Sequence, residues 1–390
     1  MFKSFRVGSV LGIPLRLDIT FLLILPLFAY IIGSEIALLV DLLAPLLSTE
    51  IDPGSLTGGV VHWGVGLAAA LGLFACVALH ELGHSVMAMR YEYHIDSITL
   101  WLFGGIANLT ETPRNWYHEF NIAIAGPVVS VVCGALAFAP LMVIDGPPVI
   151  VFLLAYLAVM NIALAAFNML PAFPMDGGRV LRSLLARNRS LPRATKLAAE
   201  TGKAFALLLG LYGLFIFNII MMGIAVFIYI AASGESKRVM MDAALGNVTV
   251  HEAMTPIEEL RMITPDVSVA ELLTRMFREQ QTSYPVVDDG RPVGLVTLGE
   301  AQSVADYERQ AMEVRDIMLT DRYSIHPDTS AIDAIRRMQR SGADQLLVTE
   351  DQDLAGMITR NNLMRVFNVV QSQGDWDAAT HRPEAQRDRV

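Results

Sequence analysis

The feature that most constrains this chain is a pair of histidines placed inside a long uncharged segment. Residues 65–79 carry no charged side chain, and they lead directly into the sequence His80-Glu81-Leu82-Gly83-His84. A segment of this length and composition is typical of a helix that crosses a lipid bilayer. Ionisable side chains are costly there, so a His-Glu-His set indicates a functional site.

The spacing of the two histidines favours a metal site. Positions four apart lie one above the other on a helix, so His80 and His84 face the same way. Both imidazoles can then reach one tetrahedral metal ion, and Glu81 is close enough to act on a water molecule there. The alternative is a chance match or a set of structural hydrogen-bond partners. Three costly polar residues at this spacing make that the weaker interpretation.

Composition and charge divide the chain into two parts. Hydrophobic residues make up 53% and charged residues 17% of the 390 residues, which is typical of an integral membrane protein. Residues 1–238 contain equal numbers of acidic and basic side chains, so the net charge of −10 falls on residues 239–390. An acidic C-terminal part argues against nucleic acid as a partner. Cys76 and Cys133 both lie in apolar runs, and two cysteines cannot form a disulfide framework.

The hydropathy pattern predicts about six membrane spans. Residues 35–48 are expected to form a helix at the interface or beside the bundle. Residues 91–117 are expected to form strands or a re-entrant loop packed against the histidine-bearing helix. The last two spans are short for a bilayer, and the break between them lies near Asn218. The six predicted spans cover residues 17–33, 61–89, 120–144, 149–170, 204–217 and 219–232.

Basic residues predict the orientation of these spans. With six spans, both termini and the loops at 90–117 and 172–203 share one side, which holds almost every Lys and Arg of residues 1–238. The side rich in Lys and Arg is the cytoplasmic one. We therefore expect a multi-pass protein of the cell (plasma) membrane. Its N- and C-termini are expected in the cytoplasm, and the two histidines near the cytoplasmic half of the bilayer.

Beyond residue 234 the sequence becomes that of a soluble domain, and it repeats. Thr264-Pro265-Asp266-Val267-Ser268 returns as residues 326–330, and Gly294-Leu295-Val296-Thr297 returns as residues 356–359, in both cases 62 residues later. Each copy is a βαββα-like unit too small to be stable alone, so the two are expected to pack as a pair. The tail from residue 371 is polar, and we expect it to be disordered.

A third metal ligand is needed, because a catalytic zinc ion has three protein ligands and one open position. The best candidate is Asp176. It lies in a break rich in proline and glycine that follows an apolar span, on the same membrane side as His84. The alternative is a turn or helix-cap residue, which is common for Asp-Gly. The metal site that lacks a ligand and the nearby Asn168 inside an apolar span favour ligation.

Two segments together resemble the paired signature of the site-2 protease family of intramembrane zinc metalloproteases. They are the His80–His84 motif and Phe167-Asn168-Met169-Leu170-Pro171-Ala172-Phe173-Pro174-Met175-Asp176-Gly177-Gly178-Arg179. The subgroup that ends in a pair of CBS (cystathionine-β-synthase) domains is similar over residues 1–370. The resemblance implies an α-helical polytopic membrane protein of about six spans with a C-terminal α/β tandem CBS-domain pair. The implied domains are 1–234 for the transmembrane zinc metalloprotease, 239–306 and 307–370 for the CBS repeats, and 371–390 for the disordered tail.

The resemblance also implies the roles of individual residues. His80, His84 and Asp176 would bind Zn²⁺, one ion per chain, and Glu81 would be the catalytic base. Asn168 would position the substrate backbone or stabilise the oxyanion.

The stretch Phe103-Gly104-Gly105-Ile106-Ala107 matches the family's loop-and-strand element, which presents an edge to an unwound substrate. Its predicted substrate-binding residues are Gly104, Gly105 and Asn108. Gly126-Pro127 matches a motif of the third span, where Ser130 stands in place of a frequent Asn, and we assign Ser130 no catalytic role.

The C-terminal pair resembles CBS domains, which commonly bind adenine nucleotides between their repeats. The family's ribose-binding Asp is replaced in both repeats, by Glu300 and by Asn362. Thr297, Glu300 and Thr359 are the candidate nucleotide contacts. A packing or homodimerisation module without a ligand is the open alternative.

The predicted function is therefore an intramembrane zinc metalloendopeptidase that performs regulated proteolysis of membrane-anchored, single-span substrates near the cytoplasmic side, under the control of its CBS domains. The alternative is a membrane transporter or channel gated by the CBS pair, with the intramembrane His and Asp side chains as an ion pathway. Tightly held zinc and an activity that depends on Glu81 distinguish the two. An inactive relative is a third possibility, against which the intact Glu81 argues.

Overall fold

The computed structural model describes residues 4–46, 51–101, 104–109, 113, 115–143, 146–320, 324–351 and 353–372. Contacts divide the chain into two compact units, Met1–Ser236 and Lys237–Val390.

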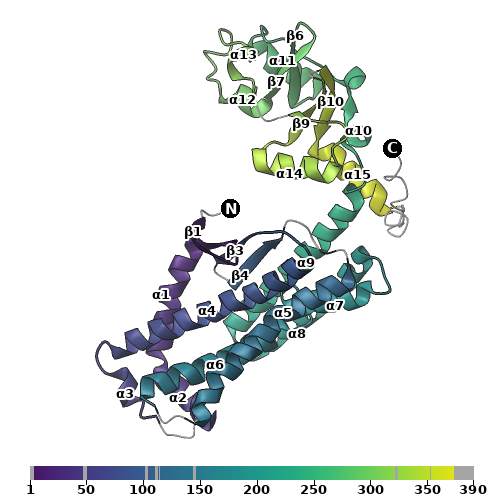
Figure 1. Cartoon of the computed structure of the whole chain (residues 1–390). Coiled ribbons are helices and arrows are strands. Elements are labelled where there is room, and N and C mark those ends of the chain that lie inside the picture. Colours follow the sequence, from purple (N-terminus) through teal and green to yellow (C-terminus); the bar gives the residue numbers. More distant parts are fainter. Residues whose placement is uncertain are drawn as a thin grey trace. The chain divides into compact units, whose positions relative to one another are not determined.

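The first unit is a bundle of helices (Figure 1). Among the described residues, five helices are long and apolar enough to cross a membrane, and a sixth span results if α1 and α2, which meet at an angle of 69°, count as one. The prediction of a helical membrane domain with about six spans is thus confirmed. The helices are α1 (Ile19–Ser34), α2 (Ile36–Leu43), α3 (Gly54–Thr57), α4 (Val61–Arg90), α5 (Trp116–Phe138), α6 (Pro148–Asn168), α7 (Asp176–Ala186), α8 (Leu191–Phe215) and α9 (Ile219–Leu245).

Helix α4 is the centre of the bundle and packs against α1, α5 and α6. Small buried residues such as Ala69 and Ala70 let neighbouring backbones approach closely, as is usual between membrane helices. The apolar segment that was expected beside the bundle is α2, which buries Ile36, Val40 and Leu43 in the same core. This packing fixes the helix that carries the two histidines.

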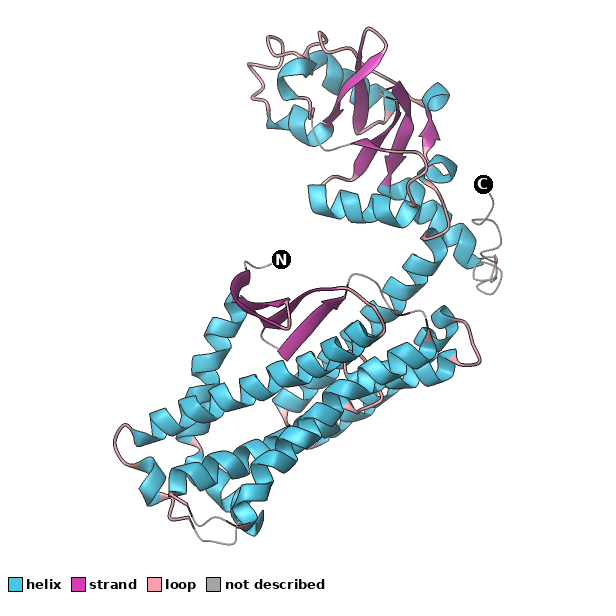
Figure 2. Ribbon diagram, in the orientation of Figure 1, coloured by secondary structure: helices cyan, strands magenta, loops and turns pink. Residues whose placement is uncertain are grey.

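A four-stranded sheet lies beside α4 (Figure 2). Its strands are β1 (Ser4–Val10), β2 (Ile13–Asp18), β3 (Ile95–Trp101) and β4 (Gly104–Leu109), in the order β1-β2-β3-β4. Strands β2 and β3 are parallel, whereas β1–β2 and β3–β4 are antiparallel. The prediction of strands within residues 91–117 is confirmed.

The first two strands, β1 and β2, were not predicted from the sequence. Every side chain of β1 is exposed, so the short alternation of Phe5 and Val7 with polar residues does not mark a buried face of the strand. The turn between β1 and β2 places Leu11 and Gly12 at positive φ, of 51° and 83°. Such a turn joins two antiparallel strands in a tight hairpin.

The prediction of two short closing spans was wrong in length. Helix α8 begins at Leu191, so Lys196 and Lys203 lie within a helix rather than in a loop. Helix α9 runs on past Ser236 to Leu245. The break itself lies where it was predicted, because Asn218 accepts a hydrogen bond from the backbone N–H of Met221 at 3.0 Å and starts α9.

The second unit contains two copies of one α/β arrangement, which confirms the predicted repeat. Helix α11 (Val269–Glu279) and strands β6 (Ser283–Asp288) and β7 (Arg291–Thr297) recur 62 residues later as α14 (Ala331–Ser341), β9 (Gln345–Glu350) and β10 (Asp353–Thr359). The hydroxyl of Ser283 donates to Oε1 of Gln345 at 2.5 Å. These two residues occupy equivalent positions, so the copies contact each other through corresponding strand ends.

The remaining elements of this unit complete the two copies. Strand β5 from the first copy pairs with β10 of the second, so the copies interlock. Of the tail predicted to be disordered, residues 373–390 lie outside the described part of the chain. The elements are α10 (Val250–Ala253), β5 (Thr255–Pro256), α12 (Leu298–Ser303), α13 (Val314–Ile317), β8 (Ser324–Ile325) and α15 (Arg360–Ser372).

Candidate metal centre

Three buried side chains converge in the membrane unit. Nε2 of His80 lies 3.2 Å from Nε2 of His84, and Oδ2 of Asp176 lies 3.2 Å and 3.0 Å from these two nitrogens. All three residues are buried. They are the one group of histidine, cysteine and acidic side chains among the described residues whose atoms are close enough to share a metal ion.

The three side chains come from two elements distant in sequence. His80 and His84 are one helical turn apart on α4, as their spacing predicts. Asp176 is the first residue of α7, after a short segment in which the N–H of Met175 donates to the carbonyl of Ala172 at 3.0 Å. That turn directs the helix start, and with it the carboxylate of Asp176, toward α4.

Both imidazoles are oriented by groups of α5. Nδ1 of His84 lies 2.6 Å from the carbonyl oxygen of Ile122 and must donate to it, which leaves Nε2 with a free lone pair. Nδ1 of His80 lies 2.8 Å from the hydroxyl of Ser130, which can accept in the same way. Hydrogen bonds of this kind fix the tautomer and the ring orientation of histidines that bind metals.

The arrangement fits a tetrahedral ion. Ligand atoms around zinc lie about 3.3 Å apart when the bonds are about 2.0–2.1 Å long. The three observed separations of 3.0–3.2 Å are close to that value. The site also depends on a glycine of α5: a Cβ at Gly126 would lie 2.3 Å from Nε2 of His84 and 2.7 Å from Nε2 of His80. The backbone of α5 thus leaves space directly beside the free lone pairs.

Glu81 lies next to this centre and against the sheet. It is half-buried on α4, one residue from His80. A Cβ at Gly105 of β4 would lie 2.1 Å from Cγ of Glu81, so only glycine fits at that point of the strand. Strand β4 ends the sheet order in the described part of the chain and therefore offers a free edge close to the carboxylate.

The remaining predicted site residues do not belong to the group of three converging side chains. Gly104 and Asn108 lie on β4 with Gly105, and the side chain of Asn108 is outside the described part. Asn168 is half-buried at the end of α6, where within the described part it makes no hydrogen bond to Glu81 or to the three converging side chains. Arg179, one turn into α7, lies 3.9 Å from the second carboxylate oxygen of Asp176.

Sequence reasoning missed the residues that orient the imidazoles. Ser130 was left without a role, yet its hydroxyl contacts His80. A polar residue four positions after Gly126, in a span without charges, was the available signal. The carbonyl of Ile122 had no signal at all, because every residue has a carbonyl group.

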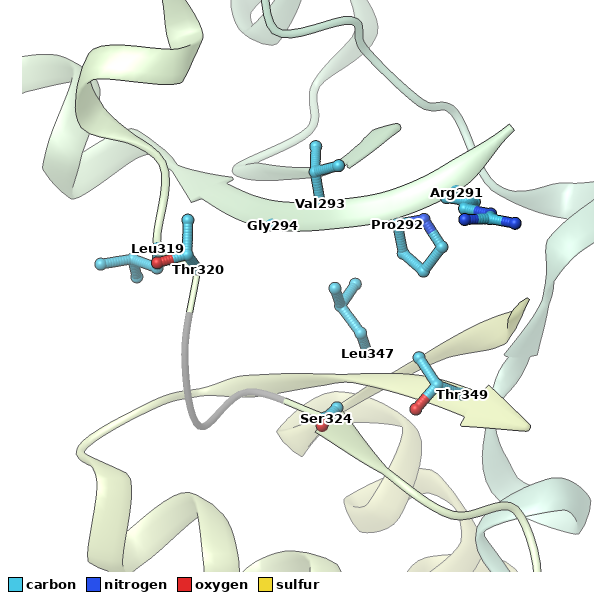
Figure 3. A pocket seen from close by; sticks show the side chains of 9 residues that line it. All are labelled: Arg291, Pro292, Val293, Gly294, Leu319, Thr320, Ser324, Leu347 and Thr349. Carbon is cyan, nitrogen blue, oxygen red and sulfur yellow. The ribbon is translucent and has the colours of Figure 1, made fainter. Parts of the chain in front are cut away.

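Two cavities in the described part of the second unit lie between its repeats. The larger, of about 400 Å³, lies between β7 and β9, with Thr320 and Ser324 at its side (Figure 3). The smaller, of about 290 Å³, is lined by eleven residues that include Thr297, Glu300 and Asp344. The candidate nucleotide contacts Thr297 and Glu300 therefore face a cavity.

The equivalent pair of the second repeat is arranged differently. Thr359 donates to the side-chain oxygen of Asn362, just as Thr297 donates to Glu300. Asn362 in addition donates to Oγ1 of Thr255 at 3.1 Å and is only 8% exposed. Its hydrogen-bonding groups are therefore used within the protein.

Comparison with known proteins relates both units to described families. A family model described as peptidase family M50 matches residues 68–151 and 146–209, and one described as CBS domain matches residues 250–303 and 314–369. Zinc metalloprotease MJ0392 of Methanocaldococcus jannaschii is 32% identical over 372 residues, which cover 94% of this chain and 97% of the relative. Rip3 of Mycobacterium tuberculosis is 30% identical over 388 residues, which cover 95% of this chain and 94% of Rip3. A solved structure of a site-2 protease from Methanocaldococcus jannaschii is 34% identical, with a TM-score of 0.40, and covers 60% of this chain and 95% of that one.

Proposed function

This chain belongs to peptidase family M50, the site-2 proteases, and we propose that His80, Glu81, His84 and Asp176 form the active site of an intramembrane zinc endopeptidase. One observation carries the proposal: three buried ligand atoms lie 3.0–3.2 Å apart with both imidazoles already oriented. The family membership also excludes the predicted alternative of a CBS-gated transporter or channel. The chain is a multi-pass membrane protein.

One zinc ion per chain would be held by the two Nε2 atoms and by the carboxylate of Asp176. When bound, zinc supplies a Lewis acid that polarises the scissile carbonyl and makes a nearby water more acidic. The protein's own groups then perform the proton transfers. The carboxylate of Glu81 acts first as a general base, which accepts the proton of the attacking water. It then acts as a general acid, which delivers this proton to the leaving amine.

We infer a substrate-binding role for β4, including Gly104, Gly105 and Asn108. A substrate helix has all its amides hydrogen-bonded, so it must unwind before its carbonyl can be attacked. An extended segment that pairs with the free edge of β4 regains those hydrogen bonds beside Glu81. Asn168 is proposed to donate a hydrogen bond to the oxyanion, or to hold the substrate backbone, once the substrate is bound.

We propose single-span, membrane-anchored proteins as the substrates, cleaved near the cytoplasmic side. The protein would lie in the cell (plasma) membrane with both termini in the cytoplasm. The support for this orientation is the concentration of Lys and Arg in the segments that share one side with the N-terminus.

For the CBS pair, we propose that an adenine nucleotide binds in the cavity lined by Thr297 and Glu300. A carboxylate can accept hydrogen bonds from a ribose, and the volume of about 290 Å³ is near the lower end of that of ligand pockets. Thr359 differs from Thr297 in its partner, which is the amide of Asn362 in place of a carboxylate. Homodimerisation through the pair, without a ligand, is the second candidate role.

The test measures zinc content and cleavage together on detergent-purified protein, with a panel of single-span proteins as substrates. We expect about one zinc ion in the wild type and in Glu81→Gln, and cleavage by the wild type only. Glu92→Gln, which makes the same change at an exposed residue just after α4, is the matched control and should cleave normally. Absence of zinc from wild type purified without chelators would contradict the proposal.

A further inference from the structure

A buried cation lies close to Asp176 on the same helix. Arg182 of α7 is 2% exposed, and its partner Glu119 of α5 is 1% exposed. Nε of Arg182 donates to Oε1 of Glu119 at 2.9 Å, and Nη2 donates to the same oxygen. Nη1 donates to Oε1 of Glu235, on α9, at 2.6 Å. Transferring charged side chains from water into a protein interior costs free energy. The chain nevertheless retains the ion pairs of Arg182 inside the helical bundle.

The same guanidinium also covers the segment that leads into Asp176. Its Cζ atom lies 5.2 Å from the centre of the Phe173 ring, and Phe173 is itself buried. Phe173 stands three residues before Asp176, and Arg182 six residues after it. One side chain therefore fixes both the approach to the third ligand and the helix that follows it.

The contact with α5 relates that ligand to the other two. Glu119 lies one turn before Ile122, whose carbonyl oxygen accepts the hydrogen bond of His84. Helix α5 also supplies Ser130, the partner of His80. The ion pair between Arg182 and Glu119 thus joins the element that carries Asp176 to the element that orients both imidazoles.

We propose that Arg182 is a positioning residue of the metal centre, which holds Asp176 at the distance from His80 and His84 that a shared ion requires. The inference rests on the proposed function of these three ligands. Arg182 makes none of its hydrogen bonds to them, so it acts through the position of α7 rather than in the reaction.

The competing explanation is an ion pair that serves only the stability of the fold. The two explanations can be separated, because replacing a complete buried ion pair by uncharged residues of similar size often leaves stability unchanged. A positioning role predicts a different outcome for the metal. Residues that hold ligands in place typically contribute 10–100-fold to metal affinity.

The experiment uses full-length, detergent-purified protein and the double variant Arg182→Met/Glu119→Gln, which removes both charges of the fully buried pair and leaves only Glu235, whose side chain is 26% exposed to solvent. Zinc affinity is measured by competition with a chelator, ligand geometry by the visible absorption of the Co²⁺-loaded protein, and stability by thermal unfolding of the metal-free form. We expect zinc binding about 10–100-fold weaker and an altered Co²⁺ spectrum, with the unfolding midpoint of the metal-free protein retained.

Three single variants sharpen the result. Arg187→Met removes another cation of the α7 region, one that lies 5.5 Å over the Trp116 ring, and should leave zinc affinity unchanged. Arg182→Lys keeps the positive charge without the planar guanidinium group, and it should retain part of the zinc affinity that the double variant loses. Phe173→Leu removes the ring contact with Arg182 and keeps an apolar side chain in the cluster that Phe173 forms with Ala198, Ala199 and Ala232. It should weaken zinc binding even if the double variant fails to fold.

Two failures are distinguishable. Wild type that binds no zinc contradicts the proposed function itself. Wild type that binds zinc, with wild-type affinity and Co²⁺ spectrum in the double variant or in Phe173→Leu, contradicts only the positioning role of Arg182.

Discussion

At the scale of single residues, the metal centre depends on how closely the backbone of α5 approaches the two imidazoles. Gly126 leaves the space beside their free nitrogens, and Ser130 and the carbonyl of Ile122 hold the opposite nitrogens. The chain therefore builds the site from two helices that carry ligands, α4 and α7, and a third, α5, that shapes the site and orients the imidazoles.

Substituting Gly126→Ala should empty the site. The new Cβ would lie 2.3 Å and 2.7 Å from the two nitrogens that bind the ion, and such sites tolerate displacements of only about 0.5 Å. We expect at least about 90% of the zinc to be lost. Metal content of the purified protein is the measurement, with Gly223→Ala, which adds its Cβ to open space on α9, as the control that keeps its zinc.

Substituting Ser130→Ala should weaken zinc binding without abolishing it. The variant removes the hydrogen bond that holds Nδ1 of His80, and losses of this kind cost about 10–100-fold in metal affinity. Chelator competition gives the value. Ser233→Ala, which removes a hydroxyl bonded only to the carbonyl of Tyr229 within α9, should bind zinc like the wild type. Equal affinities in both variants would remove Ser130 from the site.

The converging residues of the site could be predicted from the sequence, whereas the residues that orient and position them could not. His80, His84 and Glu81 are related by helix geometry, which is local, and Asp176 followed from the missing third ligand. The contacts of Ser130 and Arg182 depend on the register between α4, α5 and α7. No local pattern determines that register.

At the scale of elements, strand β4 and helix α4 together place a free sheet edge beside Glu81. Gly105 is the point of contact, since no other residue leaves room for Cγ of Glu81. The strand borders the carboxylate of Glu81, but none of the three metal ligands is its hydrogen-bond partner. Its contribution to cleavage can therefore be separated by experiment from metal binding.

Substituting Gly105→Ala should abolish activity and leave the metal in place. Its Cβ would displace the Glu81 side chain, and a misplacement of about 1 Å can cost about 100-fold in rate. Zinc content should stay near one per chain, in contrast to Gly126→Ala. Cleavage of the substrate panel and metal analysis give both values. Gly8→Ala, on β1 at the other edge of the same sheet, adds its Cβ to open space and should cleave normally.

Elements were predictable where periodicity or length identifies them. The spans around α4, α5 and α6 and the strands after Arg90 were expected, because long apolar runs and a β-rich run are strong signals. Strand β1 was missed because its alternation is short and all its side chains are exposed, and α9 was cut short because its helix continues into a polar sequence.

At the scale of the whole molecule, the two CBS repeats have the same fold and unequal sites. The carboxylate of Glu300 borders a cavity, whereas the amide of Asn362 is engaged with Thr359 and Thr255. The asymmetry accompanies the difference between Glu300 and Asn362, which occupy positions 62 residues apart.

Adenine nucleotide should stabilise the full-length protein through the first repeat only. A ligand at 100 times its Kd adds about 2.7 kcal/mol to the stability of the domain that binds it. We expect AMP or ATP to raise the midpoint of the thermal unfolding transition of the wild type and of Asn362→Ala. Glu300→Ala should lose most of this shift. A wild type that shows no shift would leave dimerisation or packing as the role of the pair.

The parallel pairing of β2 with β3 has a consequence for how the protein is made. The two strands are separated by residues 19–94, which include helices α1 and α4, yet Leu15 pairs with Ile98 and Leu17 with Leu100. During synthesis, this pair can close only after both helices have been inserted and have returned the chain to its starting side. The sheet edge beside Glu81 therefore forms late, and a nascent or misinserted chain carries the His-Glu-His motif without the strand that would present a substrate to it.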